Sequence, residues 1–127
     1  MVSFNEVNET NKILHKNIPI SATCIRVPVP FSHGVVIQAE FKKKIDIEKA
    51  TNALRNQPGI VIVDDIFNHK YPTATEATGT DDIYVGRIRM DISRKNSLLF
   101  YCVGDNVRKG AASNAVQIME KIMMERE

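Results

Sequence analysis

The sequence has little net charge, no long apolar run and no arrangement of metal-binding residues. Its formal charge is only +2, with both signs mixed along 127 residues, so a nucleic acid is not expected as the main partner. No apolar run approaches the roughly 20 residues of a transmembrane helix. The opening MVSFNEVNE is polar and acidic rather than like a signal peptide. No set of His, Cys or Asp residues has metal-ligand spacing. We therefore expect a soluble, cytoplasmic protein that binds no membrane, nucleic acid or metal.

Cysteine is scarce as well. The two cysteines, Cys24 and Cys102, lack a CxxC spacing, and both sit among apolar, strand-like residues. This pattern favours two buried thiols of a cytosolic protein over a disulfide, although the sequence alone allows either.

What the sequence does contain is the composition of a globular protein. Hydrophobic residues make up 43% of the chain, and residues 1–127 suffice for one domain with a real core. Ser3 and Glu6 have the spacing of a capping box at the start of the first helix. Apolar periodicity, with turn signals between the segments, predicts the elements. These are helices over 3–16, 47–56 and 106–124 and strands over 21–27, 34–41, 60–65, 83–92 and 97–104.

The order of these elements predicts an α+β domain with a mixed, largely antiparallel sheet. Asp46 suits the N-cap of the second helix, and either Asp105 or Asn106 can cap the last one. The close spacing of the last two strands predicts an antiparallel hairpin. Residues 68–82 have no periodicity, and we interpret them as a long loop of the kind that carries function.

The stretch TCIRVPVPFSHG, residues 23–34, begins like a strand and stops on two prolines, which cannot donate ladder hydrogen bonds. His33 follows, and Gly34 lets the backbone turn or approach a ligand. An imidazole with a pKa of about 6.5 can give and take a proton near neutrality. His33 is therefore a candidate acid/base group, with a simple polar loop residue as the alternative. Arg26 is either a surface residue or a buried guanidinium that binds a carboxylate. The prolines break the strand and so allow its side chain to converge with His33.

Three further features have both a functional and a structural interpretation. Cys24 has no predicted helix N-terminus beside it, and Arg26 is its one neighbouring charge, which favours a structural thiol over a nucleophile. The stretch GDNVRKGAASNA, residues 104–115, leads from a strand directly into a helix. Its small residues and free N–H groups suit either a polar cofactor group or tight packing. Arg87 and Arg89 are expected on one strand face, at a polar surface or a subunit interface.

Several blocks together resemble one known family, bacterial aspartate-semialdehyde dehydrogenase. The blocks are VNETNKIL at 7–14, SATCIRVPVPFSHG at 21–34, YPTATEATGTDDIYVGRIRMD at 71–91 and GDNVRKGAASNAVQI at 104–118. They follow the family's order, and their combination is specific where no single block is. The resemblance implies a C-terminal catalytic and dimerisation domain of the glyceraldehyde-phosphate and aspartate-semialdehyde dehydrogenase type, with helices packed on one face of the sheet.

The resemblance also implies an activity and roles for three residues. The family makes aspartate semialdehyde, on the way to lysine, threonine and methionine, by NADPH-dependent reduction of aspartyl phosphate, which an enzyme cysteine attacks. By this resemblance Arg26 would clamp the substrate carboxylate, and His33 would be the general acid/base. Asn106 would lie beside the nicotinamide end of NADP. The implied assembly is a homodimer.

The chain departs from the family in ways that bear on activity. It resembles only about the last third of the family's chain, without the N-terminal NADP-binding domain and the nucleophilic cysteine. Cys24 does not replace that cysteine, because the family has a cysteine in this block as well. Asn5 stands where the family has a phosphate-holding lysine. We expect the chain to be inactive alone, with a separate cofactor-binding domain as a candidate partner. A related acyl-phosphate reductase, such as the acetylglutamyl-phosphate enzyme, and a non-catalytic dimerisation or regulatory module are the alternatives.

Overall fold

Four strands form one sheet in the computed structural model, which describes residues 4–125. They are β1 (His33–Glu40), β2 (Ile60–Ile62), β3 (Ile83–Met90) and β4 (Ser97–Gly104). Their spatial order is β1-β4-β3-β2. β4 pairs antiparallel with β1 and β3, while β2 pairs parallel with β3. The predicted mixed, largely antiparallel sheet and its hairpin are therefore confirmed.

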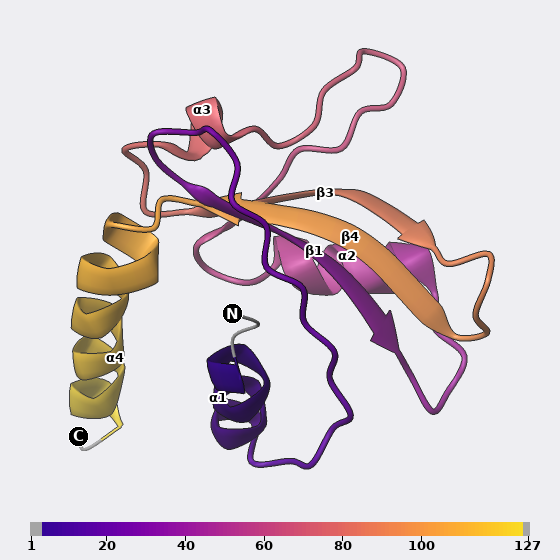
Figure 1. Ribbon diagram of the computed structural model, residues 1–127, viewed down its shortest axis with the longest axis horizontal. Coiled ribbons are helices and arrows are strands. Elements are labelled where there is room, and N and C mark those ends of the chain that lie inside the picture. The colour runs from indigo at the N-terminus through magenta and orange to yellow at the C-terminus, as the bar shows by residue number, and fades with distance from the viewer. Residues whose placement is uncertain (1–3, 126–127) are drawn as a thin grey trace.

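Helical segments flank this sheet. They are α1 (Phe4–Leu14), α2 (Ile47–Arg55), α3 (Ala74–Ala77), the π-helix η1 (Arg108–Ala112) and α4 (Ser113–Met124). Figure 1 shows α2 below the strands and α3 above them. α2 packs against β2 and β3 through its half-buried apolar side. As predicted, Asp46 caps α2, and its carboxylate accepts a hydrogen bond from the Lys49 amide at 3.0 Å.

The predicted strand over 21–27 is wrong. These residues belong to no strand, and the side chains of Ile25 and Val27 are exposed. β-branched residues favour a strand only where a neighbouring strand and a face to bury are available. Here the segment runs outside the sheet until it reaches β1 (Figure 1), and no strand of residues 4–125 pairs with it. Its closing prolines also lack the N–H groups that a ladder needs.

The predicted loop over 68–82 contains a short helix, α3. Thr73 caps this helix by accepting from the Glu76 amide at 3.3 Å, while its hydroxyl donates to the Glu76 carboxylate at 2.8 Å. The T-A-T-E sequence is a capping-box signal that the sequence interpretation overlooked.

The other predicted caps have different outcomes. Neither Asp105 nor Asn106 is the N-cap residue of η1 or α4, which are Val107 and Ala112; the Asp105 carboxylate accepts from the amides of Val107 and Arg108 just where η1 begins. Ser3 lies outside the described residues, so its predicted capping box with Glu6 stays a prediction.

A β-bulge interrupts β3 between Gly86 and Arg89. Arg87 has a positive φ of 58°, and the carboxylate of Asp64 accepts from the Ile88 amide at 2.8 Å. A bulge breaks the alternation of side chains along a strand. The expectation that Arg87 and Arg89 share one face depended on that alternation, so it does not hold across this bulge.

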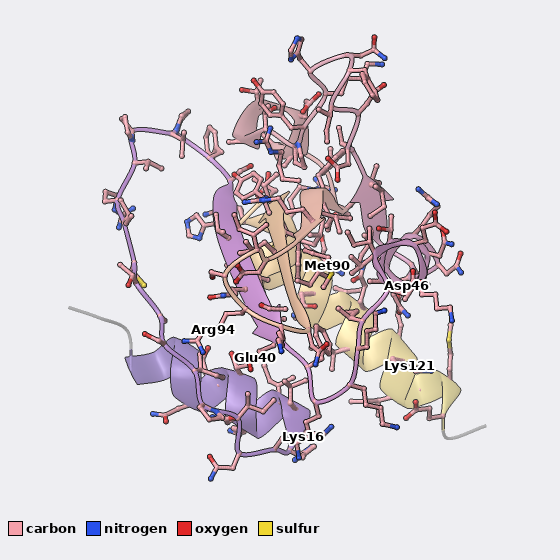
Figure 2. The ribbon with its side chains drawn as sticks, turned by 90° about the vertical axis from the view of Figure 1, so that its right-hand side faces the viewer. Lys16, Glu40, Asp46, Met90, Arg94 and Lys121 are labelled. Carbon is pink, nitrogen blue, oxygen red and sulfur yellow. The ribbon has the colours of Figure 1, made fainter. Side chains whose placement is uncertain are left out.

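Burial divides the described chain into two parts. The buried apolar residues all belong to the sheet region, which we define as residues 32–113: Ala77, Val85, Leu98 and Val103. The flanks, residues 4–31 and 114–125, leave large apolar side chains exposed, among them Ile13, Ile118 and Met119. Figure 2, with Lys16 and Lys121 marking the two flanks, shows α1 and α4 extending away from the sheet. Among the described residues, nothing covers the apolar side of α4.

Candidate functional site

A hollow of about 340 Å³ lies where β4 ends and the chain enters η1. Its lining residues come from β1, β3, β4 and the segment after β4: His33, Val35, Ile83, Cys102, Val103, Gly104, Asp105, Asn106, Lys109 and Gly110. Two of the three residues with roles implied by the sequence, His33 and Asn106, therefore line one hollow from opposite ends of the chain.

The pairing of β1 with β4 brings these walls together. His33 lies opposite Gly104, and Val35 lies opposite Cys102. Residues directly opposite in an antiparallel pair project from the same face of a sheet, so this face forms the wall of the hollow. Gly34 projects to the other face, where a Cβ would lie 2.1 Å from the Tyr101 hydroxyl oxygen. The glycine therefore makes room for the Tyr101 ring.

The turn before His33 is fixed by hydrogen bonds to distant segments. The Ser32 amide donates to the Asn106 side-chain oxygen at 2.8 Å. The Ser32 hydroxyl lies 3.0 Å from the Thr78 hydroxyl, which itself donates to the Ala74 carbonyl at 2.7 Å. Because a hydroxyl has a single hydrogen, Ser32 is the donor to Thr78. Ser32 is 2% exposed and Thr78 is exposed, so this clamp is buried at its Ser32 end.

Asp105 joins the long loop to the end of β4. Its carboxylate accepts from the Gly79 amide at 2.8 Å, and from the amides of Val107 at 2.8 Å and Arg108 at 3.1 Å. These backbone hydrogen bonds, that of Gly79 first, lower the pKa of Asp105. An ionised carboxylate therefore lies next to Asn106 in the sequence and fixes the start of η1.

A second carboxylate strengthens the same connection. Asp81 forms a bidentate pair with Arg108, at 3.0 Å to Nε and 2.6 Å to Nη2, and also accepts from the Ser113 hydroxyl. The guanidinium hydrogen bonds, with that of Ser113, lower the pKa of Asp81 to about 2. The loop over 71–82 is thus held at both Gly79 and Asp81 against the segment that carries Asn106.

Arg26 lies apart from this assembly. It is exposed in the flank, it makes no hydrogen bond or ion pair with another described residue, and it does not line the hollow. The predicted convergence of Arg26 with His33 is absent from this conformation of the described chain. The loss of the 21–27 strand explains the separation, since that strand would have fixed where Arg26 projects.

The two cysteines differ from the expectation in one respect. Cys24 is exposed rather than buried, while Cys102 is partly buried, and no disulfide joins them. Burial raises the pKa of the Cys102 thiol, so this residue is protonated near neutral pH and is a poor nucleophile.

Lys109 is a lining residue that the sequence analysis did not single out. Its ammonium group donates to the Gln117 side-chain oxygen, and it supplies a cation beside the hollow. The sequence could have indicated Lys109 as a lining residue through its position three residues after Asn106, because residues three apart lie on one side of a helical turn. Among residues 4–125, no group of His, Cys, Asp or Glu side chains is arranged to hold a metal ion. No helix in the described part is long and apolar enough to cross a membrane.

Comparisons with known proteins converge on one family. The family model described as "Semialdehyde dehydrogenase, dimerisation domain" matches residues 3–109. An aspartate-semialdehyde dehydrogenase of Campylobacter jejuni is 50% identical over 115 residues, covering 91% of this chain and 34% of that protein. That of Aquifex aeolicus is 46% identical over 118 residues, with 92% and 35% covered.

Solved structures give the same result. Aspartate-semialdehyde dehydrogenase II from Vibrio cholerae, complexed with ASA, has a TM-score of 0.86 at 39% identity, with 93% of this chain and 35% of that one covered. The enzyme from Francisella tularensis has a TM-score of 0.83 at 28% identity, over 94% of this chain and 34% of that one. The present chain spans about a third of the length of the curated relatives it matches.

Proposed function

Because the chain belongs to the semialdehyde dehydrogenase dimerisation-domain family, we propose that it serves the NADPH-dependent reduction of aspartyl phosphate to aspartate semialdehyde. This reaction would place it in the synthesis of lysine, threonine and methionine. One observation carries the proposal most directly: the turn that presents His33 is hydrogen-bonded to the side chain of Asn106. An acid/base group and a group for the cofactor end are thereby held in one hollow.

His33 is the proton-transfer group in this proposal. It lies at the first position of β1, at the edge of the hollow and exposed to an incoming substrate. Its imidazole would give a proton to the substrate carbonyl oxygen as that oxygen gains charge, and take it back in the reverse direction. Lys109 adds positive charge beside the hollow and would favour an anionic substrate.

The residues of the hollow fit the nicotinamide end of NADP. Val35 and Ile83 offer apolar wall, and Asn106 offers a side-chain amide. The oxygen of Asn106 already accepts from Ser32, so its NH₂ group is the part that would donate to a carboxamide. When bound, the cofactor supplies the hydride; the chain's own residues orient the ring and hold the proton.

Arg26 would act as the carboxylate clamp only after the flank moves. We assign this role to an arrangement in which another domain covers residues 4–31 and brings the guanidinium to the hollow. A planar guanidinium can bind a carboxylate through two parallel hydrogen bonds. The exposed apolar residues of the same flank, such as Ile13 and Leu14, are consistent with a covering domain.

The chain alone would not turn over, because no thiol near His33 is a competent nucleophile. The test combines the 127-residue chain with the cofactor-binding domain of the Campylobacter jejuni relative, fused or as a separate chain, and measures NADP-dependent oxidation of aspartate semialdehyde with phosphate. In the reconstituted protein, His33→Asn should lower kcat by about 10²- to 10⁴-fold. His69→Asn, in the exposed 65–70 turn, is the matched control.

The outcomes separate the candidate functions. Activity that survives His33→Asn would reject the proposed role of His33. Reduction of a longer acyl phosphate such as acetylglutamyl phosphate, in preference to aspartyl phosphate, would favour the related reductase. Failure of every reconstituted protein, with a stable assembly still formed, would favour a non-catalytic dimerisation module.

A homodimer is the assembly that we propose. The sheet face opposite the hollow carries Val36, which is 71% exposed, and the row Gln38, Leu99 and Arg89. A two-fold contact would bury this face twice. Sedimentation equilibrium at micromolar concentration should give the dimer mass, and Arg89→Glu, which reverses the charge on this face, should weaken the dimer. A monomer mass throughout that range would reject the dimer.

A further inference from the structure

We infer that Ser32 and Thr78 are positioning residues for His33. Their hydroxyl groups form a clamp that fixes the turn from which His33 enters β1. The inference rests on the proposed function, in which His33 transfers the proton, and it adds two residues to that site.

The backbone at Ser32 needs such a clamp. Ser32 has a φ of 72°, in the left-handed region that disfavours residues with a Cβ. A residue keeps this conformation only where its surroundings hold it there. Ser32 is 2% exposed, and both of its hydrogen-bond donors are used, the amide by Asn106 and the hydroxyl by Thr78.

Thr78 is itself held in place by hydrogen bonds to α3. It follows the last turn of α3, and its hydroxyl donates to Ala74 at 2.7 Å while its amide donates to the same carbonyl at 3.1 Å. The next residue, Gly79, donates to the buried Asp105. The turn before His33 is therefore tied through Thr78 to α3 and through Asn106 to the start of η1.

These contacts set the place of His33 rather than its chemistry. No hydrogen bond from Ser32 or Thr78 reaches the imidazole. Their removal should therefore leave the proton-transfer group present but allow the backbone at residue 32 more than one conformation. A Ser32→Gly variant is informative because glycine accepts the left-handed φ but has no hydroxyl.

The test compares Thr78→Val, Thr78→Ser and Ser32→Gly in the full 127-residue chain. Thr75→Val, an exposed threonine of α3, is the matched control. NMR would follow the imidazole signals of His33 and the hydrogen exchange of the Ser32 amide. We expect Thr78→Val and Ser32→Gly to broaden or split the His33 signals. Exchange at residue 32 should be about fivefold faster or more in Thr78→Val, while Thr78→Ser and Thr75→Val behave as the unchanged chain.

A purely local stabilising role predicts a different result. In that case Thr78→Val would lower the unfolding midpoint while the His33 signals kept their position and width, and the inference would be overturned. If Thr78→Val fails to fold, the His33 signals of Ser32→Gly test the inference instead, because this variant removes the hydroxyl without adding backbone strain. In the reconstituted enzyme, Thr78→Val should lower kcat with little change in KM, and Thr78→Ser should restore it.

The two proposals fail separately. Undisturbed His33 signals in both clamp variants would reject the clamp and leave the role of His33 intact. Full activity of His33→Asn would reject that role, whereas the NMR comparison would still decide whether the clamp fixes the turn.

Discussion

The sheet region and the flanks of this chain have similar proportions of apolar residues, but among the described residues the buried apolar side chains are all in the sheet region. Val103 in β4 is 1% exposed, whereas Ile13 in α1 is 75% exposed and Met123 in α4 is 62% exposed. The sheet region also contains the network around Asp105 and Asp81, while α4 carries one solvent-exposed ion pair, between Lys121 and Glu125. A segment gains stability from apolar residues only where another surface covers them.

The candidate site crosses the boundary between these two regions. His33, Asn106 and their clamp belong to the sheet region, and Arg26 belongs to the flank. The first part of the site is therefore assembled by this chain's own contacts. Arg26 is exposed and does not line the hollow, so in our proposal it reaches the site only when another surface covers the flank.

Hydrogen exchange should show the largest difference between the regions. Backbone amides exchange through local opening, whose free energy runs from nearly zero in uncovered segments to the full stability in the core. We expect the amides of β4 to exchange orders of magnitude more slowly than those of α1 and α4. Exchange measured by mass spectrometry at several protein concentrations tests this. Equal protection of α4 and β4 would show that α4 is covered in solution.

A pair of identical truncations should separate the regions by stability. Leu98→Ala removes a side chain that is 3% exposed and should lower the free energy of unfolding by about 2 to 5 kcal/mol. Leu14→Ala in α1 removes the same atoms from a side chain that is 50% exposed and should change it by about 0.5 kcal/mol or less. Urea denaturation followed by circular dichroism measures both. Similar losses for the two variants would contradict the division.

Much of the sheet region could be predicted because local signals and tertiary context agree there. The Asp46 cap, the apolar alternation of β1 and the short hairpin connection each point to the structure that forms. Asp105 and Asn106 were both possible caps, and only the structure shows that their side-chain oxygens accept from different partners. The Asp105 carboxylate accepts from the amides of Val107 and Arg108, and the Asn106 oxygen accepts from Ser32.

Two of the errors share one physical cause, which is that a sequence pattern does not state what covers a segment. The 21–27 segment has strand composition, but no neighbouring strand pairs with it. Cys24 was expected to be buried for the same reason and is exposed. The clamp of Ser32 and Thr78 was not predicted, because it joins residues 46 apart in sequence that carry no shared motif.

Removal of the Asp105 carboxylate should have the next largest effect. It accepts from three backbone amides, and Asp105→Ala leaves all three without this partner. Asp46→Ala is the comparison, since that carboxylate accepts from the single amide of Lys49 at an exposed helix start. We expect Asp105→Ala to lower Tm by clearly more than Asp46→Ala. Calorimetry of both variants at pH 7 provides the check, and the reverse order would show that the junction after β4 is held mainly by other contacts.

The smallest expected effect is the pH dependence that Asp81 contributes. Its pKa is lowered from 3.8 to about 2 in the folded chain, chiefly by Arg108. A carboxylate with a depressed folded pKa stabilises the fold above its unfolded pKa and loses that contribution as pH falls through the folded value. The pair with Arg108 is partly exposed, so solvent and salt weaken it.

Asp81→Asn should therefore be less stable than the unchanged chain at pH 6, and the difference should shrink between about pH 4 and 2. Glu125→Gln removes the carboxylate of the exposed ion pair at the end of α4 and should differ little from the unchanged chain in stability. Urea unfolding at pH 6, 4 and 3 measures both variants. A difference for Asp81→Asn that stays constant with pH would show that the side chain acts through packing rather than through its charge.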